Sequence, residues 1–300
     1  MKKNSSKPIY KQWWLWGAII LLGVIIFAVL NLDNVSNEPF DAQRSINVYT
    51  REEGSGTRTA FTEVTELVDE NGDDAITLTA TVQNSTNAIT QAIARDTHGI
   101  SYVSLGSLND SVKGVAVDGV EPTAENIQSG EYTLYRNFNV VFGRELSEVA
   151  KDFWNFMVSA QAQGLVELDG FVPVESDAPE YEAKGLSGTI SVVGSTSVEP
   201  TVQRFAEAYR EYNPNVKIDI TAPGSGAGIT SAIDGTSDIG MSSREPSEEE
   251  FAQLIDVQPI ATDGIVIIVN NNNPISSLTT NQIHGIYSEF YTIWDELLDN

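Results

Sequence analysis

The sequence contains no cysteine and only two histidines in 300 residues. Without cysteine, the chain can form no disulfide, no thiol nucleophile, no cysteine-based metal site and no lipidated N-terminal cysteine. The two histidines, His98 and His284, lie far apart in the sequence and are too few to predict a metal cluster. We therefore expect neither a metal nor a cofactor.

Positive charge is also scarce. The chain has 17 Lys and Arg against 42 Asp and Glu, a formal net charge of -25. Such a surface repels nucleic-acid backbones and argues against nucleic acid as a partner. It cannot attract a small anion as a whole either. An anion site in this protein must therefore be local and built from oriented dipoles.

Only one long hydrophobic run is present, at residues 13–30. As a helix it would be about 27 Å long, close to the ~30 Å thickness of the hydrocarbon core. Four lysines precede it and acidic residues follow it, so residues 1–12 are expected in the cytoplasm and the rest outside. A cleaved signal peptide is the alternative, but the run ends without a small-x-small cleavage site. We predict an uncleaved single-pass anchor in the cell membrane, followed by a polar linker at 31–45.

The first part of the chain after the linker combines a strand, a Gly-rich turn and a helix. Residues 46–50 have the β-branched pattern of a buried strand, and the turn Gly-Ser-Gly-Thr at 54–57 precedes helical spacing. A helix that starts at such a turn presents unpaired N–H groups. Ser55 and Thr57 add hydroxyl donors, and Arg51 adds a fork-shaped cation. The stretch predicts an anion clamp, although a Gly-rich turn without a ligand has the same pattern.

Two further stretches repeat this design. The strand at 189–193 leads through Gly-Ser-Thr-Ser to a helix with Pro200 in its first turn. The strand at 216–220 leads through Gly-Ser-Gly-Ala-Gly at 224–228 to a short helix. Three such units could direct three helix N-termini at one small oxyanion.

The rest of the chain alternates strands and helices. A strand is predicted at 76–82, a capped helix follows Asn84, and an amphipathic helix spans 147–162. A β-branched run fills 257–269. This alternation predicts an α/β protein with a largely parallel sheet covered on both faces.

Several of these turns together resemble the phosphate-binding proteins of phosphate ABC importers (PstS-type). The motifs that carry the resemblance are Arg-Glu-Glu-Gly-Ser-Gly-Thr-Arg at 51–58, Gly-Ser-Thr-Ser-Val at 194–198, Gly-Ser-Gly-Ala-Gly at 224–228 and Asp-Ile-Gly-Met-Ser-Ser-Arg at 238–244. The likeness covers nearly everything from residue 46 to residue 300. It implies a two-lobe, periplasmic-binding-protein-like (type 2) fold with two crossing strands and an anion between the lobes.

The order of the motifs differs from that family, in which the Gly-Ser-Thr-Ser turn comes first. The sequence resembles a circular permutant, in which residues 174–186 join the former ends and residues 293–297 would ordinarily run into residue 46. A slice of a tandem array is the alternative. The resemblance implies one domain at 46–300, with one lobe at 112–270 and the other at 46–111 plus 271–300.

The resemblance also implies a set of ligand-binding residues. Arg51 would bind two oxygens of the anion, and hydroxyls and backbone N–H groups would donate the other hydrogen bonds. The residues that match the family pattern are Arg51, Ser55, Gly56, Thr57, Thr196, Ser197, Ser225 and Ser243. Many members of the family carry an aspartate at the position of Ser243, where it accepts the proton of hydrogen phosphate. Glu52, Glu53, Glu199 and Glu245 are candidates to replace it, and each also fits a solvated surface residue.

The implied function is binding of inorganic phosphate and its delivery to the membrane permease of an ABC importer. Three alternatives remain: a binding protein for sulfate or molybdate, a tethered anion sensor, and an enzyme. Catalysis is disfavoured because neither Ser55 nor Ser225 lies in Gly-x-Ser-x-Gly or near a histidine, and Gly-Lys-Ser/Thr is absent. We predict a protein that is not an enzyme.

Overall fold

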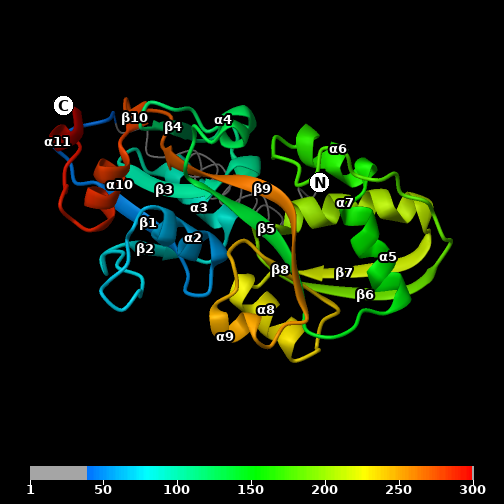
Figure 1. Cartoon of the computed structure of the whole chain (residues 1–300). Helices are drawn as coiled ribbons and strands as arrows, with labels where there is room; N and C mark the ends of the chain where they lie inside the picture. The colour runs from blue at the N-terminus through cyan, green and yellow to red at the C-terminus, as the bar shows by residue number, and fades with distance from the viewer. Residues whose placement is uncertain (1–38, 299–300) are drawn as a thin grey trace, which may run out of the picture. The chain divides into compact units, whose positions relative to one another are not determined.

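The computed structural model describes residues 39–298, which form a single compact unit. Figure 1 shows strands that run through the middle of this unit and helices packed around them. The helices, in chain order, are α2 (Gly56–Val64), α3 (Thr86–Arg95), η2 (Leu105–Ser107), α4 (Ala124–Ser129), α5 (Glu148–Met157), α6 (Ala160–Leu168), α7 (Glu199–Tyr212), α8 (Ser225–Ile233), α9 (Glu248–Phe251), α10 (Thr280–Tyr287) and α11 (Asp295–Leu298). The strands are β1 (Asn47–Arg51), β2 (Thr81–Gln83), β3 (Gly99–Ser104), β4 (Lys113–Val117), β5 (Tyr135–Phe142), β6 (Ser187–Gly194), β7 (Asn215–Thr221), β8 (Ile239–Ser242), β9 (Asp256–Val269) and β10 (Ser277–Leu278).

The sheet runs in the order β2-β1-β3-β9-β5-β8-β6-β7, with β4 and β10 beside β9. The pairs β1–β3 and β6–β7 are parallel, whereas β9 pairs antiparallel with its neighbours β3, β4 and β5. The predicted α/β class is therefore confirmed, but the sheet is mixed and not largely parallel, because β5 and β9 pair antiparallel with all of their neighbours.

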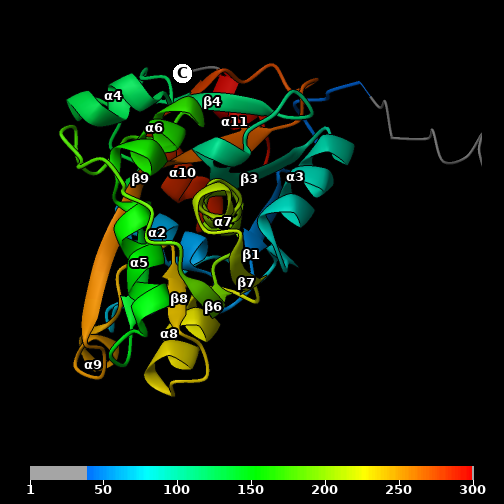
Figure 2. The same ribbon diagram turned by 90° about the vertical axis from the view of Figure 1, so that its right-hand side faces the viewer.

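The two largest hydrophobic cores of the described residues define two lobes. One core belongs to the first lobe. It includes residues up to Leu134 and residues from Ile265 onward, with Trp294 among them. The other core begins at Phe138 and ends at Ala261. The chain thus passes from the first lobe to the second along β5 and returns along β9. Figures 1 and 2 both show β9 as a long orange strand, and Figure 1 shows it running from one lobe into the other.

The lobe boundaries predicted at 112 and 270 therefore need correction. Val115 and Val117 pack in the core of the first lobe, because β4 pairs with β9 and β10 there. The chain passes between the lobes near residues 135 and 263, where β5 pairs with β9. The boundary predicted at 112 is too early, because the residue pattern of β4 is equally typical of a strand in either lobe.

The strand predicted at 76–82 is also largely wrong. Only Thr81–Gln83 form a strand, and the preceding residues make a turn that leaves Leu78 fully exposed. The N–H of Thr77 donates to the carbonyl of Tyr287 at 2.8 Å. This bond to another segment holds the backbone out of the sheet.

The beginning of the domain lies before the predicted residue 46. The Phe40 ring stacks on His98 with centroids 5.5 Å apart, and the carbonyl of Ala42 accepts a hydrogen bond from Asp295 N at 2.9 Å. The predicted linker thus packs against the domain from residue 39 onward. The predicted cytoplasmic segment at 1–12 and anchor at 13–30 lie outside the described residues. Among residues 39–298, no helix has the length and apolar character needed to cross a membrane.

Candidate anion-binding site

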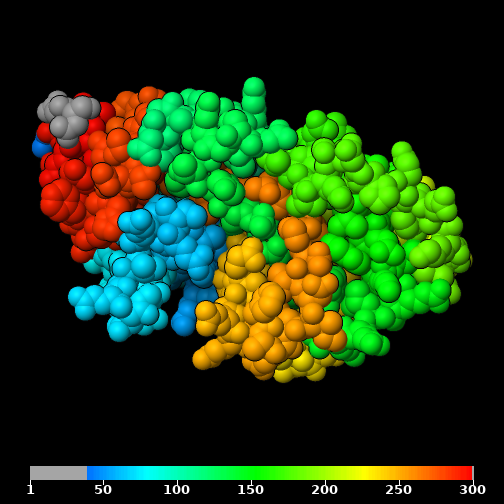
Figure 3. Space-filling view, in the orientation of Figure 1, coloured from blue at the N-terminus to red at the C-terminus, as the bar shows by residue number. Residues whose placement is uncertain are grey.

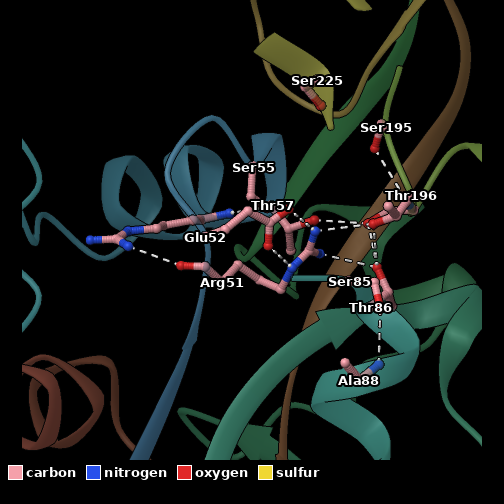
Figure 4. Close-up of polar contacts among 12 residues, drawn as sticks. Arg51, Glu52, Ser55, Thr57, Ser85, Thr86, Ala88, Ser195, Thr196 and Ser225 are labelled. Carbon is pink, nitrogen blue, oxygen red and sulfur yellow. Dashed lines mark hydrogen bonds and ion pairs between the residues drawn. The ribbon is translucent and has the colours of Figure 1, made fainter. Parts of the chain in front are cut away.

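The three predicted strand–turn–helix units meet where the lobes face one another. β1 leads into α2, β6 into α7 and β7 into α8, and the N-termini of these helices converge. A fourth helix, α3, joins them: Ser85 caps its first turn by accepting a hydrogen bond from Ala88 N at 3.1 Å. Figure 4 shows their side chains gathered in one place. Helix N-termini with unpaired N–H groups are a common setting for anions.

Arg51 is the cation of this cluster and is 2% exposed. Its guanidinium donates to Glu52 through Nε at 2.8 Å and through Nη2 at 2.7 Å, which is a fork-shaped, two-bond contact. Nη1 donates to Thr86 Oγ1 at 3.1 Å, and Nη2 also donates to Thr196 Oγ1 at 3.0 Å. Thr196 belongs to the other lobe, so Arg51 connects the two lobes directly.

Hydroxyl groups surround the guanidinium. Thr57 Oγ1 lies 2.8 Å from Ser197 Oγ, which lies 3.0 Å from Thr86 Oγ1. All three side chains are buried. A buried hydroxyl can both donate and accept, so this group can turn its protons toward a central oxyanion.

The Gly-rich turn of the second lobe completes the cluster. Ser225 and Ser243 are fully buried with Oγ atoms 3.3 Å apart, and Ser195 Oγ donates to Ser243 Oγ at 2.9 Å. Gly56 faces them from the first lobe, where a Cβ atom would lie only 2.7 Å from Ser243 Oγ. The two lobes thus approach so closely here that only glycine fits.

All eight predicted site residues therefore lie in one cluster. Ser55 is buried at the N-terminus of α2 and accepts a hydrogen bond from Arg58 N at 3.4 Å. The sequence alone did not predict Thr86 and Ser195 as members of the cluster. It also did not predict the fork-shaped contact between Arg51 and Glu52. The sequence signal for Thr86 is Asn-Ser-Thr-Asn at 84–87, which also follows a strand and precedes a helix, but by itself this pattern indicates only a helix cap.

A cavity of about 350 Å³ borders this cluster. Thr86 and Thr196 line it together with exposed Asn109 and Glu199. The wall residues come from both lobes. A small solute can therefore reach the cluster along the boundary between the lobes.

A buried ion pair holds the crossing strands. Asp263 accepts from Arg136 Nη2 at 3.0 Å, from Ser104 Oγ at 2.8 Å and from Leu105 N at 3.0 Å. Burial raises the pKa of Asp263 to about 6, although Arg136 and the hydrogen bonds act in the opposite direction. These contacts join β3, β5 and β9 at the point where the chain passes between the lobes.

The three other acidic candidates, and His98, lie in different surroundings. Glu245 accepts a hydrogen bond from Asn139 at 3.0 Å, and Glu53 and Glu199 are exposed. His98 is buried beside Phe40 and its Nε2 accepts a hydrogen bond from Asp41 N at 3.0 Å. Glu52 is thus the one carboxylate among these candidates that contacts Arg51.

Comparison with known proteins agrees with this architecture. The PBP superfamily domain matches residues 27–161 and 179–300, which places the chain in that class of two-lobe proteins. The chain is 41% identical over 291 residues to phosphate-binding protein PstS 2 of Streptococcus pneumoniae, covering 96% of this chain and 99% of that protein. It is 40% identical over 283 residues to PstS 2 of Streptococcus agalactiae, covering 92% and 94%. The chain therefore belongs to the PstS family within the PBP superfamily.

A solved structure supports the fold directly. The crystal structure of a phosphate-binding protein of a phosphate ABC transporter from Streptococcus pneumoniae TIGR4 superposes with a TM-score of 0.69 at 43% identity. The superposition covers 84% of this chain and 99% of that chain.

Proposed function

We propose that this protein binds inorganic phosphate between its lobes and delivers it to the membrane permease of an ABC importer. The observation that carries the proposal is the convergence of Arg51 with serine and threonine hydroxyls from both lobes at four helix N-termini. The PstS 2 relatives are named for phosphate binding, which supports the choice of ligand. The site offers hydrogen bonding and no arrangement of nucleophile and base, so we propose binding without catalysis.

The magnitudes fit this proposal. Micromolar affinity requires about 8 kcal/mol of binding free energy. Hydrogen bonds to a charged group contribute roughly 1.5–3 kcal/mol each. Because seven other predicted residues lie in the same cluster as Arg51, their donors can supply this free energy and still offset desolvation and lobe closure.

The choice between phosphate and sulfate depends on an acceptor for the ligand's proton. Ser243 replaces the aspartate of many relatives, and its hydroxyl can accept. The Glu52 carboxylate is the second acceptor, because an anion bound to Arg51 would lie beside it. We propose that Glu52 favours hydrogen phosphate, since two unprotonated anions in contact repel one another. Sulfate or molybdate remains the alternative ligand.

We further propose that residues 13–30 anchor the protein in the cell membrane with its binding domain outside. The fold is proposed to be a permuted form of the family arrangement. The contact between the N–H of Ile46 and the carbonyl of Thr292, at 2.9 Å, supports this idea. In the unpermuted order these two segments would be joined by a covalent connection.

Calorimetry with phosphate, sulfate, arsenate and molybdate tests the ligand. We expect phosphate to bind with micromolar or tighter affinity and sulfate to bind at least tenfold more weakly. Tight binding of sulfate together with no heat from phosphate would reassign the protein to another oxyanion.

A further inference from the structure

A second arginine lies close to the anion site without belonging to the predicted set of ligand-binding residues. Arg58 is in the first turn of α2, and its side chain is partly buried, at 22% exposed. A positive charge is unfavourable at the N-terminus of a helix, and the first turn of α2 contains no acidic residue that would offset it. The position of Arg58 therefore requires a reason other than the stability of its own helix.

The side chain of Arg58 holds the backbone of Arg51. Its Nη1 donates to the carbonyl of Arg51 at 2.9 Å. On the other side of the same residue, the N–H of Arg51 donates to the Tyr102 hydroxyl at 3.5 Å. Arg51 is the last residue of β1, where the regular pairing of the strand ends. Because both of its peptide groups are held by side chains, the direction of the Arg51 side chain depends on them.

Aromatic packing fixes α2 relative to these contacts. The ring of Phe61, in α2, stacks on the ring of Tyr102 with centroids 4.0 Å apart, and both side chains are fully buried. Tyr102 thus contacts both the backbone of Arg51 and the helix that carries Arg58. Stacked aromatic rings of this kind add to the free energy of burial. Arg58 therefore reaches Arg51 from a rigid frame.

Asp74 determines where the Arg58 guanidinium points. Nε of Arg58 donates to Asp74 Oδ2, and Asp74 Oδ1 accepts from the N–H of Ile76 at 2.8 Å. The carboxylate supplies the negative charge that the first turn of α2 lacks. Since the guanidinium is planar, a contact at Nε on one edge fixes the direction of Nη1 toward Arg51.

The loop that carries Asp74 is ordered by hydrogen bonds of its own. Oδ1 of Asp69 accepts from the N–H groups of Asn71 at 2.8 Å and Asp73 at 2.9 Å, and the N–H of Asp69 donates to the carbonyl of Asp73 at 2.7 Å. Figure 3 shows the segment from α2 into this loop, in blue to cyan, on the surface of the protein. The exposed loop at 69–74 thus presents Asp74 in one place without support from a core.

We infer that Arg58, held by Asp74, is a positioning residue for phosphate binding, because it fixes the carbonyl of Arg51 and so directs the Arg51 guanidinium at the anion. The inference rests on the proposed function. Arg58 acts through Arg51 and does not itself contact the anion. The acidic loop at 69–74 therefore contributes to phosphate affinity from outside the site, although its own charge repels phosphate.

Calorimetry with inorganic phosphate on full-length variants tests the inference. Arg58→Met keeps the length of the side chain and removes every donor. We expect it to bind phosphate at least tenfold more weakly than the wild type. Arg144→Met is the control, because Arg144 pairs with Asp238 in the second lobe and is 51% exposed, and its affinity should stay within twofold of the wild type. Thermal melting should show both variants folded.

Asp74→Asn separates positioning from charge. The asparagine keeps an oxygen for the N–H of Ile76 but removes the charge that holds Arg58. Positioning predicts that phosphate affinity falls at least threefold. The loss of a negative charge near the site would by itself raise the affinity for an anion. Unchanged or tighter binding by Asp74→Asn would therefore overturn the inference.

A double variant tests whether Arg58 acts through Arg51. Arg58→Met combined with Arg51→Lys should bind phosphate within twofold of Arg51→Lys alone, because the fork that Arg58 positions is already absent. Losses of affinity that multiply in the double variant would overturn the inference, since the two residues would then act independently. Failure of the wild type to bind phosphate would instead refute the proposed function.

Discussion

Arg51 and Thr196 are separated by 145 positions in the sequence, yet Nη2 of the arginine donates to the threonine hydroxyl at 3.0 Å. The arginine belongs to the first lobe and the threonine to the second. This contact places the main cation of the site at the boundary between the lobes. A ligand that binds Arg51 therefore also acts on the relative position of the lobes.

The first prediction concerns Arg51 itself. Arg51→Lys should weaken phosphate binding at least 100-fold, because lysine provides a single point of charge and cannot replace the separate donors that Arg51 directs at Glu52, Thr86 and Thr196. Calorimetry measures the change. Arg204→Lys is the control, since Arg204 is partly exposed and pairs with Asp169 outside the site. Equal affinities for the two variants would contradict a role of Arg51 in binding.

The second prediction concerns Gly56. Gly56→Ala should weaken phosphate binding at least tenfold, because its Cβ would lie 2.7 Å from Ser243 Oγ of the opposite lobe and even closer to Ser225. Rotation of the two hydroxyls would not relieve the clash, because Ser225 Cβ would also lie only 2.9 Å away, so the facing segments would have to move apart. Gly164→Ala is the control: a Cβ there meets no atom within 4 Å. Thermal melting should show both variants folded, and unchanged binding by Gly56→Ala would argue against lobe closure at this contact.

The third prediction concerns Glu52. Glu52→Gln keeps a side chain that can accept a hydrogen bond from Arg51 but removes the negative charge. Sulfate should then bind at least tenfold more tightly, and the preference for phosphate should decrease, because the repulsion of an unprotonated anion is lost. Competition calorimetry with both anions measures the ratio. Exposed Glu53→Gln is the control, and an equal gain for phosphate and sulfate would show that Glu52 sets affinity without selecting the ligand.

The fourth prediction concerns pH and Asp263. Its pKa in the folded protein is raised from 3.8 to about 6, so between these values the folded state keeps a proton that the unfolded chain releases. This contribution to stability is complete below about pH 4 and is lost as the pH rises through about 6. At about 1.4 kcal/mol per pKa unit, the loss is roughly 3 kcal/mol.

Asp263→Asn should lack this contribution, because its side chain stays uncharged. Urea unfolding at several pH values measures the difference. We expect the stability of the wild type relative to Asp263→Asn to fall from pH 4 to pH 7. Parallel pH curves for the two proteins would contradict the raised pKa.

The fifth prediction concerns the segment at 174–186. Tyr181 donates through its hydroxyl to buried Asp152 at 2.6 Å and accepts from Asn213 at 2.7 Å, which attaches the segment to the second lobe. Tyr181→Phe should lower the free energy of unfolding by roughly 1.5–3 kcal/mol, the usual contribution of a hydrogen bond to a charged group. Tyr212→Phe is the control, because Tyr212 packs beside the same rings but is 40% exposed. Faster proteolysis of the segment in Tyr181→Phe alone would support the attachment.

Local sequence patterns were sufficient to predict the features that depend only on neighbouring residues. The turns at 54–57 and 224–228 predicted helix N-termini with hydroxyl donors, and both helices begin there. The long β-branched run at 257–269 coincides with most of β9. These features depend on neighbouring residues, so periodicity and turn chemistry are sufficient to find them.

Other features depend on residues distant in the sequence. The alternating pattern at 76–82 predicted a strand, but a hydrogen bond from Thr77 to Tyr287 turned most of it into an exposed loop. The lobe boundary near residue 135 follows from the pairing of β5 with β9, which no local pattern shows. The residues around Thr86 indicate a helix cap. Only the packing of distant segments places Thr86 within hydrogen-bond distance of Arg51.

The sequence by itself determined the α/β class, the acidic surface, the absence of cysteine chemistry and the turns that start the site's helices, because each is a property of composition or of adjacent residues. The tertiary structure alone decided which turns meet, which carboxylate contacts Arg51 and where the chain crosses between lobes. The physical reason is that these outcomes arise from contacts between distant segments, whose free energy depends on how the whole chain packs.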